Sequence, residues 1–135
     1  MTYTAAMLDS HPAVTDDFDR KALVAAIDAA FDCAQACSTC ATACLAEKSV
    51  ADLRPCIRTD LACADICDAT GRVLSRQPAD DLAAVRALLE ACVTVCAACA
   101  AECETHAAMH EHCRICAEAC RRCEQACREL LGSMT

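Results

Sequence analysis

The sequence has very few of the residues that usually fill a core or build loops. Aromatic residues make up 2% of its 135 residues, Trp is absent, and there are two Gly and three Pro. So few turn-forming residues argue against a small secreted fold cross-linked by disulfides, because such folds are rich in loops. A net charge of −8, without a basic stripe, argues against binding to nucleic acid. The length fits a single domain.

We expect no targeting segment in this sequence. The start of the chain has neither the basic region nor the apolar run of a secretory signal. The most apolar stretch, residues 82–103, is interrupted by Arg86 and Glu90, so we expect no membrane span there. We therefore expect a cytoplasmic protein, in which thiols stay reduced unless a metal binds them.

Cysteine is the residue present in excess. Sixteen of the 135 residues are Cys, a share above the roughly 8 to 10% that marks a cysteine-based scaffold. Within each run, successive Cys are mostly three or four residues apart, which places their thiols on one stripe of an α-helix. Disulfides between neighbours on one helix face would be strained, although bridges between helices remain open under oxidation.

Four apolar segments rich in Ala, Leu, Glu and Arg predict helices separated by short polar stretches. The predicted helices cover about 16–48, 52–75, 80–104 and 107–131. Asp16 and Asp19 have the spacing of an N-cap and its third helical residue, Pro55 suits a first turn, and Gly132 suits a helix stop. The pattern predicts an all-α fold, an antiparallel up-down four-helix bundle with a Cys-lined core.

We expect one domain over residues 16–132, after a flexible segment over residues 1–15. The domain contains an internal repeat. The spacing of Cys33, Cys37, Cys40 and Cys44 recurs in Cys92, Cys96, Cys99 and Cys103, while Cys56, Cys63 and Cys67 correspond to Cys116, Cys123 and Cys127. We interpret this as a duplicated helical hairpin, about 33–75 and 92–131, in which Asp60 stands where the second copy has Cys120.

If the helices alternate in direction, the Cys stripes stack in four layers. The predicted layers are Cys33, Cys67, Cys92 and Cys127; Cys37, Cys63, Cys96 and Cys123; Cys40, Asp60, Cys99 and Cys120; and Cys44, Cys56, Cys103 and Cys116, with Cys113 beyond the last. One end of the bundle then holds a dry aliphatic plug of Leu23, Ile27, Phe31, Val73, Leu74, Leu82, Val85, Leu88, Leu89, Leu130 and Leu131. The other end carries His106, Met109, His110 and His112 and forms the mouth of a thiol-lined tube.

Charge and geometry favour Cu(I) as the metal. Four zinc ions on four thiolates each would bury about eight negative charges, at a severe desolvation cost. Cu(I) accepts two or three thiolates, and each Cu(I) that replaces a thiol proton leaves the charge unchanged. Two thiols at i and i+4 lie within reach of a single ion. Iron–sulfur clusters are disfavoured because their Cys runs wrap a loop around the cluster.

The Cys-x-x-x-Cys-x-x-Cys-x-x-x-Cys runs, the duplicated hairpin and the His-x-x-x-His-x-His-Cys segment at residues 106–113 resemble the cytosolic copper storage protein family. The resemblance covers about residues 16–131. It implies a four-helix bundle that holds many Cu(I) ions on thiolates, takes up metal at the His-bearing end and often forms a homotetramer. It also implies storage that limits copper toxicity or supplies copper enzymes. Whether a copper chaperone or a small thiol is the donor stays open.

By this resemblance the sixteen Cys are candidate metal ligands, and His106, Met109, His110 and His112 are candidates for copper capture at the mouth. Asp60 interrupts an otherwise complete ladder. We expect its carboxyl group to face the cavity as an oxygen donor or a hydrogen-bond acceptor. The alternative is that it turns outward to meet Arg54 or Arg58 in a weak surface pair.

High-capacity Cu(I) storage makes the chain a binding protein rather than an enzyme. Two other functions remain open. A thiol redox protein would need a reactive Cys-x-x-Cys pair at a helix start, whereas pairs such as Cys37–Cys40 lie mostly in mid-helix. A zinc- or cadmium-buffering protein would use the same thiols but with a larger buried charge. The number of ions bound distinguishes the three.

Overall fold

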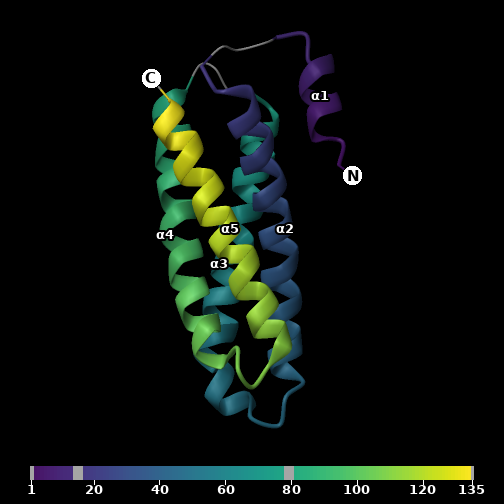
Figure 1. Ribbon diagram of the computed structural model, residues 1–135, viewed down its shortest axis with the longest axis vertical. Helices are drawn as coiled ribbons and strands as arrows, with labels where there is room; N and C mark the ends of the chain where they lie inside the picture. Colours follow the sequence, from purple (N-terminus) through teal and green to yellow (C-terminus); the bar gives the residue numbers. More distant parts are fainter. Residues whose placement is uncertain (1, 14–16, 78–80, 135) are drawn as a thin grey trace.

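A computed structural model describes residues 2–13, 17–77 and 81–134 of the chain. Its elements are α1 (Thr4–Ser10), α2 (Arg20–Leu45), the 3-10 helix η1 (Val50–Leu53), α3 (Arg54–Ser75), α4 (Leu82–His106) and α5 (Glu111–Ser133). These residues contain no strand, and the four long helices α2 to α5 run alternately up and down (Figure 1). The predicted all-α four-helix bundle is confirmed.

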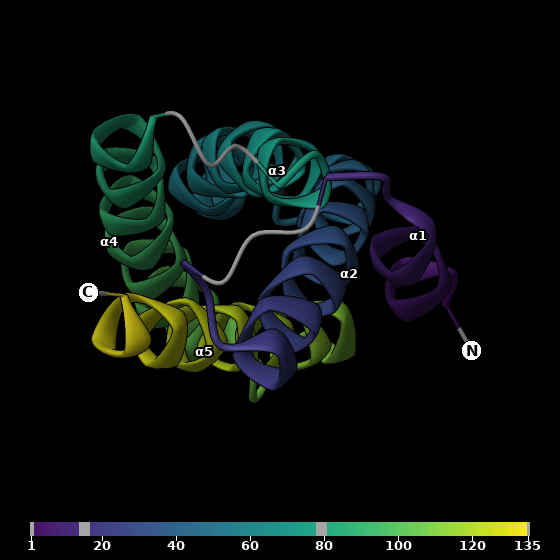
Figure 2. The ribbon, with the colours of Figure 1, turned by 90° about the horizontal axis from the view of Figure 1, so that it is seen from above.

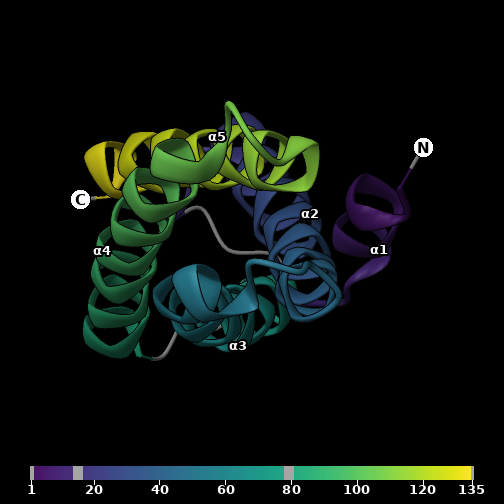
Figure 3. The same ribbon diagram turned by 90° about the horizontal axis from the view of Figure 1, so that it is seen from below.

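The four long helices form a closed ring. Helix α2 packs against α3 and α5, and α4 packs against the same two helices. The two end-on views show all four around a common centre (Figures 2 and 3). The connections at residues 46–53 and 107–110 lie together at the end that faces the viewer in Figure 3. We call this end the mouth, and we call the opposite end the closed end.

Two helices begin at aspartate caps, and the cap of α2 is Asp19, which the spacing predicts as the third helical residue rather than the N-cap. The side chain of Asp19 accepts a hydrogen bond from the backbone N–H of Ala22, 2.9 Å away, at the start of α2. Asp81 does the same for Ala84 at the start of α4, at 3.1 Å. Asp16, the predicted start of the first helix, lies outside the described residues. In each described cap, a carboxylate satisfies a backbone donor that has no partner within the helix.

The helix ends at the mouth differ from the prediction. Helix α2 ends at Leu45 rather than near residue 48, and a 3-10 turn precedes Arg54. Helix α5 begins at Glu111 rather than near residue 107, because His110 has extended backbone and acts as its N-cap residue. Gly132 lies inside the last turn of α5 instead of stopping it. The mouth is therefore formed by two connecting segments, residues 46–53 and 107–110, rather than by tight turns.

A short helix precedes the bundle, where the sequence analysis expects only a flexible segment over residues 1–15. Helix α1 lies on the outside of α2 (Figures 1 and 2). The Thr4 hydroxyl donates to Asp28 of α2, Arg20 pairs with Asp9, and the Leu8 side chain is buried. Thr4–Ser10 thus form a helix that packs on α2, and the flexibility of residues 1–15 stays a prediction.

Most of the predicted aliphatic plug lies in the core at the closed end. Six of its side chains are no more than 3% exposed: Leu23, Ile27, Leu74, Val85, Leu89 and Leu130. Val73, Leu82, Leu88 and Leu131 are partly buried, and Phe31 is the one exposed member, at 38%. A Cβ placed on Gly71 of α3 would lie 2.8 Å from two Phe31 ring atoms. The Phe31 ring therefore covers the backbone of Gly71. Its predicted place in the plug is wrong.

Helices α2 and α4 are long and apolar enough to cross a membrane, by length and composition alone. This is weak support for a membrane location, because the core helices of bundles and signal sequences meet the same criterion. In the bundle, the inner faces of both helices carry buried Cys side chains.

Candidate metal centre

All sixteen Cys side chains lie in the centre of the bundle. Each is at most 1% exposed and carries a free thiol. They come from all four long helices, because spacings of three and four residues keep the side chains of one run on one helix face. The structure thus confirms that the predicted sulfur stripes converge on a single core and are not joined by disulfides.

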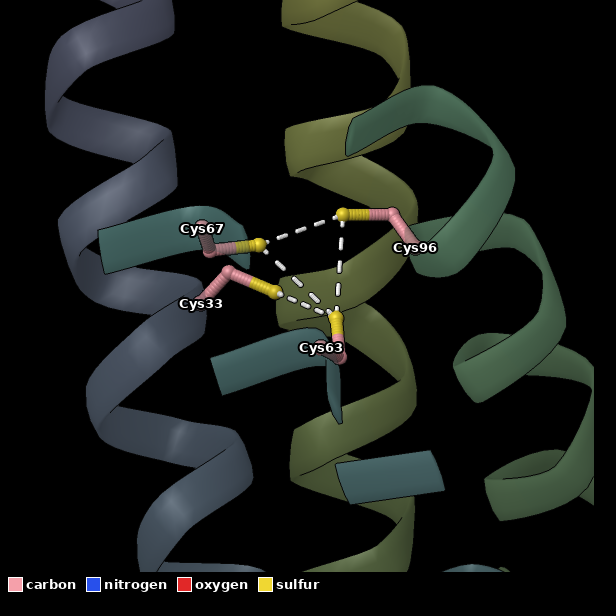
Figure 4. A group of neighbouring side chains, drawn as sticks. All are labelled: Cys33, Cys63, Cys67 and Cys96. Carbon is pink, nitrogen blue, oxygen red and sulfur yellow. Dashed lines mark hydrogen bonds between the residues drawn. The ribbon is translucent and has the colours of Figure 1, made fainter. Parts of the chain in front are cut away.

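The thiols are arranged in a column. Every one of the sixteen sulfur atoms lies 3.4–4.0 Å from at least one other. Figure 4 shows four of them, from three different helices, pointing toward one another. A soft ion placed at such a point would have several sulfur donors within reach of small side-chain movements.

The predicted layers hold between α3 and α4. The Cys67 and Cys92 sulfurs lie 3.8 Å apart, as do those of Cys63 and Cys96. The Cys127 sulfur is also 3.8 Å from that of Cys92. Helices α3 and α4 therefore stack their thiols in the register that the spacing predicts. Helix α5 is displaced toward the closed end, because the Cys123 sulfur lies 4.0 Å from that of Cys67 and the Cys116 thiol lies 3.3 Å from Asp60.

Helix α2 departs from the predicted register. Cys33 is expected beside Cys67 and Cys127, but its sulfur instead contacts those of Cys63 at 3.8 Å and Cys120 at 3.7 Å. Cys37 is displaced in the same direction, with its sulfur 3.5 Å from that of Cys120. The whole α2 column lies about one helical turn, roughly 5 Å, nearer the mouth. The connection at residues 46–53, which contains η1, is long enough to permit this offset.

The predicted layers leave Cys113 beyond the last layer, but the offset of α2 brings two thiols to it. The Cys113 sulfur lies 3.9 Å from that of Cys40 and 4.0 Å from that of Cys44. These three thiols and His112 form one of the groups whose ligand atoms all lie within 4.8 Å of one another. Cys113 is thus part of the column, at its mouth end.

The possible metal-binding groups share members. One group is Cys33, Cys63, Cys67 and Cys96, and a second is Cys67, Cys92, Cys96 and Cys123. A third, Cys33, Cys37, Cys63 and Cys120, overlaps the first. Because the same thiol belongs to two groups, separate four-thiolate sites cannot all be filled at once. Shared thiols suit ions that are bridged by thiolates, as Cu(I) is.

Asp60 is fully buried within the column, as the sequence analysis favours. Its Oδ1 accepts hydrogen bonds from the thiols of Cys99 at 3.1 Å, Cys116 at 3.3 Å and Cys103 at 3.5 Å. Burial, with added repulsion from the neighbouring sulfurs, raises the pKa of Asp60 to about 12. The carboxyl group is therefore neutral in the metal-free protein at pH 7.

Two of the predicted capture residues meet at the mouth through a residue that the sequence analysis does not single out. The Oε2 atom of Glu47 lies 2.8 Å from Nδ1 of His110 and 2.9 Å from Nε2 of His112. The other ring nitrogen of His112, Nδ1, lies 3.4 Å from the Cys40 sulfur and 3.6 Å from the Cys113 sulfur. The sequence signal for Glu47 is an acidic residue in the loop that the up-down topology places beside the histidines.

The other two predicted capture residues are not part of this contact. His106 bonds instead to Glu102 on its own helix, with Nε2 2.7 Å from Oε2. Met109 is 78% exposed, in the loop between α4 and α5. A role in capture stays a prediction for both.

The charges at the mouth differ from one group to the next. Burial lowers the pKa of His112, but its hydrogen bonds to Cys40 and Glu47 raise the pKa by more, so that it lies above the ordinary value. The pKa of Cys40 is lowered by its hydrogen bonds, first that with Cys103 and also those with Cys56 and His112. Burial raises the pKa of Cys44. Among the mouth thiols, Cys40 ionises first.

The burial of the thiols weakens the redox alternative. The members of the pair Cys37 and Cys40, and of the pair Cys96 and Cys99, are at most 1% exposed and lie within α2 and α4. A thiol–disulfide exchange centre needs a sulfur that a partner can reach. The arrangement therefore favours metal binding over exchange with other proteins.

Comparisons with known proteins point in the same direction. Residues 19–132 match the family model described as copper storage protein. The copper storage protein Ccsp from Streptomyces lividans, solved loaded with 10 copper equivalents, is 56% identical with a TM-score of 0.94, and the match covers 97% of this chain and 99% of that one. The Cu(I)-bound copper storage protein BsCsp3 is 37% identical with a TM-score of 0.70, over 78% of this chain and 94% of that one.

A curated relative from Bacillus subtilis (strain 168), an uncharacterized cysteine-rich protein named YhjQ, is 39% identical over 75 residues, which are 53% of this chain and 69% of that protein. The apo form of a copper storage protein from Bacillus subtilis is 36% identical with a TM-score of 0.67, over 79% of this chain and 96% of that one.

Proposed function

Because this chain belongs to the copper storage protein family, we propose that it stores Cu(I) ions on the thiol column between its four long helices. The observation that carries the proposal is the column itself, in which sixteen buried free thiols each lie within 4.0 Å of another. The Streptomyces relative holds ten copper equivalents. A column of this length would bind many ions rather than one.

Electroneutrality supports Cu(I) over a divalent ion. The free thiols of the column are neutral where they keep their protons, and exchange of each proton for one Cu(I) adds no net charge to the core. Exchange of four protons for one Zn(II) leaves two negative charges in a region that water does not reach. The core has one further adjustable charge, because Asp60 can release a proton where copper ions outnumber thiolates around it.

The mouth is the proposed route of uptake. We assign the first contacts of an incoming ion to His112, Cys40 and Cys113, whose donor atoms lie 3.4–3.9 Å apart. His106, Met109 and His110 would assist capture, and Asp60 would act deeper in the column as an oxygen donor or as an acceptor of thiol hydrogen bonds. The closed end offers no comparable route through its described residues, because its core is aliphatic.

The cellular setting follows from the relatives. A structure of the Streptomyces relative is described as a cytosolic copper storage protein, and a reducing cytosol would keep the thiols of this chain free to bind copper. We propose a cytosolic role as a copper reservoir, with a copper chaperone or a small thiol as the donor. Storage, and not catalysis, is the proposed activity.

The chain is further proposed to assemble as a homotetramer. Leu61 of α3 and Ile115 of α5 are about half exposed, and the hollow that Ile115 lines on α5 is flanked by Arg114 and Glu118. An apolar centre with a charged rim is typical of an interface between subunits. Light scattering coupled to gel filtration should give about four times the 14.3 kDa chain mass, and a mass of one chain would refute the assembly.

Anaerobic titration of the reduced protein with Cu(I), against a competing chelator, tests the storage function. We expect tight binding up to about one ion per thiol. A plateau at about four ions would indicate separate four-thiolate sites and would contradict the proposal. Replacement of Cys33, Cys63, Cys67 and Cys96 together by Ala should lower the plateau by about four ions.

The matched control alters the mouth without altering the column. Replacement of His106, His110 and His112 together by Ala should slow loading and leave the plateau almost unchanged. Unchanged loading kinetics would remove the mouth from the uptake route while leaving storage intact.

A further inference from the structure

Glu47 stands outside the thiol column, yet it holds two residues of the mouth at once. It follows the end of α2, in the connection to α3, while His110 and His112 belong to the start of α5. A single carboxylate oxygen, Oε2, accepts from Nε2 of His112 at 2.9 Å and lies 2.8 Å from Nδ1 of His110. The rings stack with their centroids 5.5 Å apart. Glu47 therefore joins the two loops of the mouth through one atom.

The bond to His112 has a chemical consequence for the opposite side of its ring. A neutral imidazole carries one proton, and the carboxylate can only accept, so the bond to Glu47 places that proton on Nε2. In this neutral form the other nitrogen, Nδ1, keeps its lone pair. Nδ1 lies 3.4 Å from the Cys40 sulfur and 3.6 Å from the Cys113 sulfur. The lone pair thus faces the two thiols at the top of the column.

We propose that Glu47 is a positioning residue for copper uptake, which sets the tautomer and the orientation of His112 so that Nδ1 can bind Cu(I) together with Cys40 and Cys113. The inference rests on the proposed function. A carboxylate that accepts from the distal nitrogen of a metal-binding His fixes the ring and raises the basicity of the ligating nitrogen. Without Glu47, the His112 side chain, which is 25% exposed, would sample both tautomers and other ring orientations.

The alternative is that Glu47 only fastens the two loops together. The two roles predict different results for the metal-free protein. A fastener affects stability, whereas a positioning residue determines which nitrogen of His112 carries the proton. The ring nitrogens of ¹⁵N-labelled His differ widely in NMR chemical shift between the protonated and unprotonated states, so the tautomer can be read directly and without copper.

The experiment compares the full chain with Glu47→Ala and with Glu111→Ala, each reduced and metal-free, at a pH where His112 is neutral. Glu111 is the matched control, because it lies between the two histidines in sequence and carries the same charge, but its partner is Arg114. We expect Nε2–H of His112 in the unchanged chain and in Glu111→Ala, and a mixture of tautomers in Glu47→Ala.

Stopped-flow loading with Cu(I) supplies the second readout. Loss of such a positioning carboxylate typically costs 10–100-fold, so Glu47→Ala should load at least about tenfold more slowly with an unchanged final plateau. Glu111→Ala should load within about twofold of the unchanged chain. A protonated Nδ1 in the unchanged chain, or a tautomer that is the same in Glu47→Ala, would overturn the inference. A low copper plateau would instead refute storage, and the tautomer result would stand apart from it.

Discussion

Replacement of Asp60 by Asn should make the metal-free protein more stable at neutral pH. Asp60 is fully buried, and its pKa is raised to about 12, against about 3.9 in an unfolded chain. The folded protein therefore keeps a proton that the unfolded chain releases above pH 4. Stability is complete below the unfolded pKa and falls as the pH rises toward the folded one. Each pH unit in this window costs about 1.4 kcal/mol.

The size of the effect follows from the width of the window. Between pH 5 and pH 7, the free energy of unfolding of the unchanged chain should fall by about 3 kcal/mol through Asp60 alone. Asn has nearly the same shape, and its carbonyl oxygen can accept from the thiols of Cys99, Cys103 and Cys116 without titrating. The variant should lack this slope.

Urea unfolding of both proteins under anaerobic, reducing conditions, followed by circular dichroism at several pH values, measures the difference. Contributions from the thiols and the histidines are common to both proteins, so they cancel in the comparison. We expect nearly equal stability near pH 4 and a gap that widens by about 1.4 kcal/mol per pH unit above pH 5. Parallel profiles would show that the Asp60 carboxyl group is not held neutral and would refute the reasoning.

Three further predictions concern the scaffold. In a Phe31→Ala background, Gly71→Ala should stabilise the protein by about 1 kcal/mol through helix propensity. In the unchanged chain the gain should be much smaller, because the new methyl group would meet the Phe31 ring. Equal gains in urea unfolding would contradict this contact. Asp19→Ala should cost about 1 kcal/mol in the same assay through the lost cap on α2, and no loss would show that the cap contributes nothing. Because all sixteen thiols are buried, a bulky alkylating reagent should modify the folded metal-free protein only slowly and fully after denaturation, as followed by mass spectrometry; rapid native labelling would contradict the buried column.

Sequence periodicity was enough to predict the bundle and the inward direction of its thiols, because helical spacing fixes which side chains share a face. It also favoured an inward Asp60. Helix register was harder to predict, because it depends on the connection between two helices. Stacking the Cys stripes of alternating helices places Cys33 beside Cys67. The actual connection after α2 permits an offset of about one turn, so that Cys33 contacts Cys63.

Residues whose importance comes from a tertiary contact were missed. Glu47 follows α2 as an ordinary acidic loop residue, and only the fold brings it to His110 and His112. Phe31 fits the apolar pattern of the plug, but the absence of a side chain on Gly71 draws its ring to the outside of the bundle. Short-range spacing contains no information on either contact.

The two ends of the bundle separate folding from storage. At the closed end, buried side chains such as Ile27, Leu74, Leu89 and Leu130 each contribute about 1.5 to 3 kcal/mol from the burial of apolar surface, and none of them is a metal ligand. Neutral thiols add to this core as small hydrophobic groups. The helices can therefore assemble before any copper arrives, unlike small zinc domains that fold only with metal. Because the scaffold is independent of its cargo, we expect that copper can leave through the proposed mouth without unfolding the protein, as a reservoir requires.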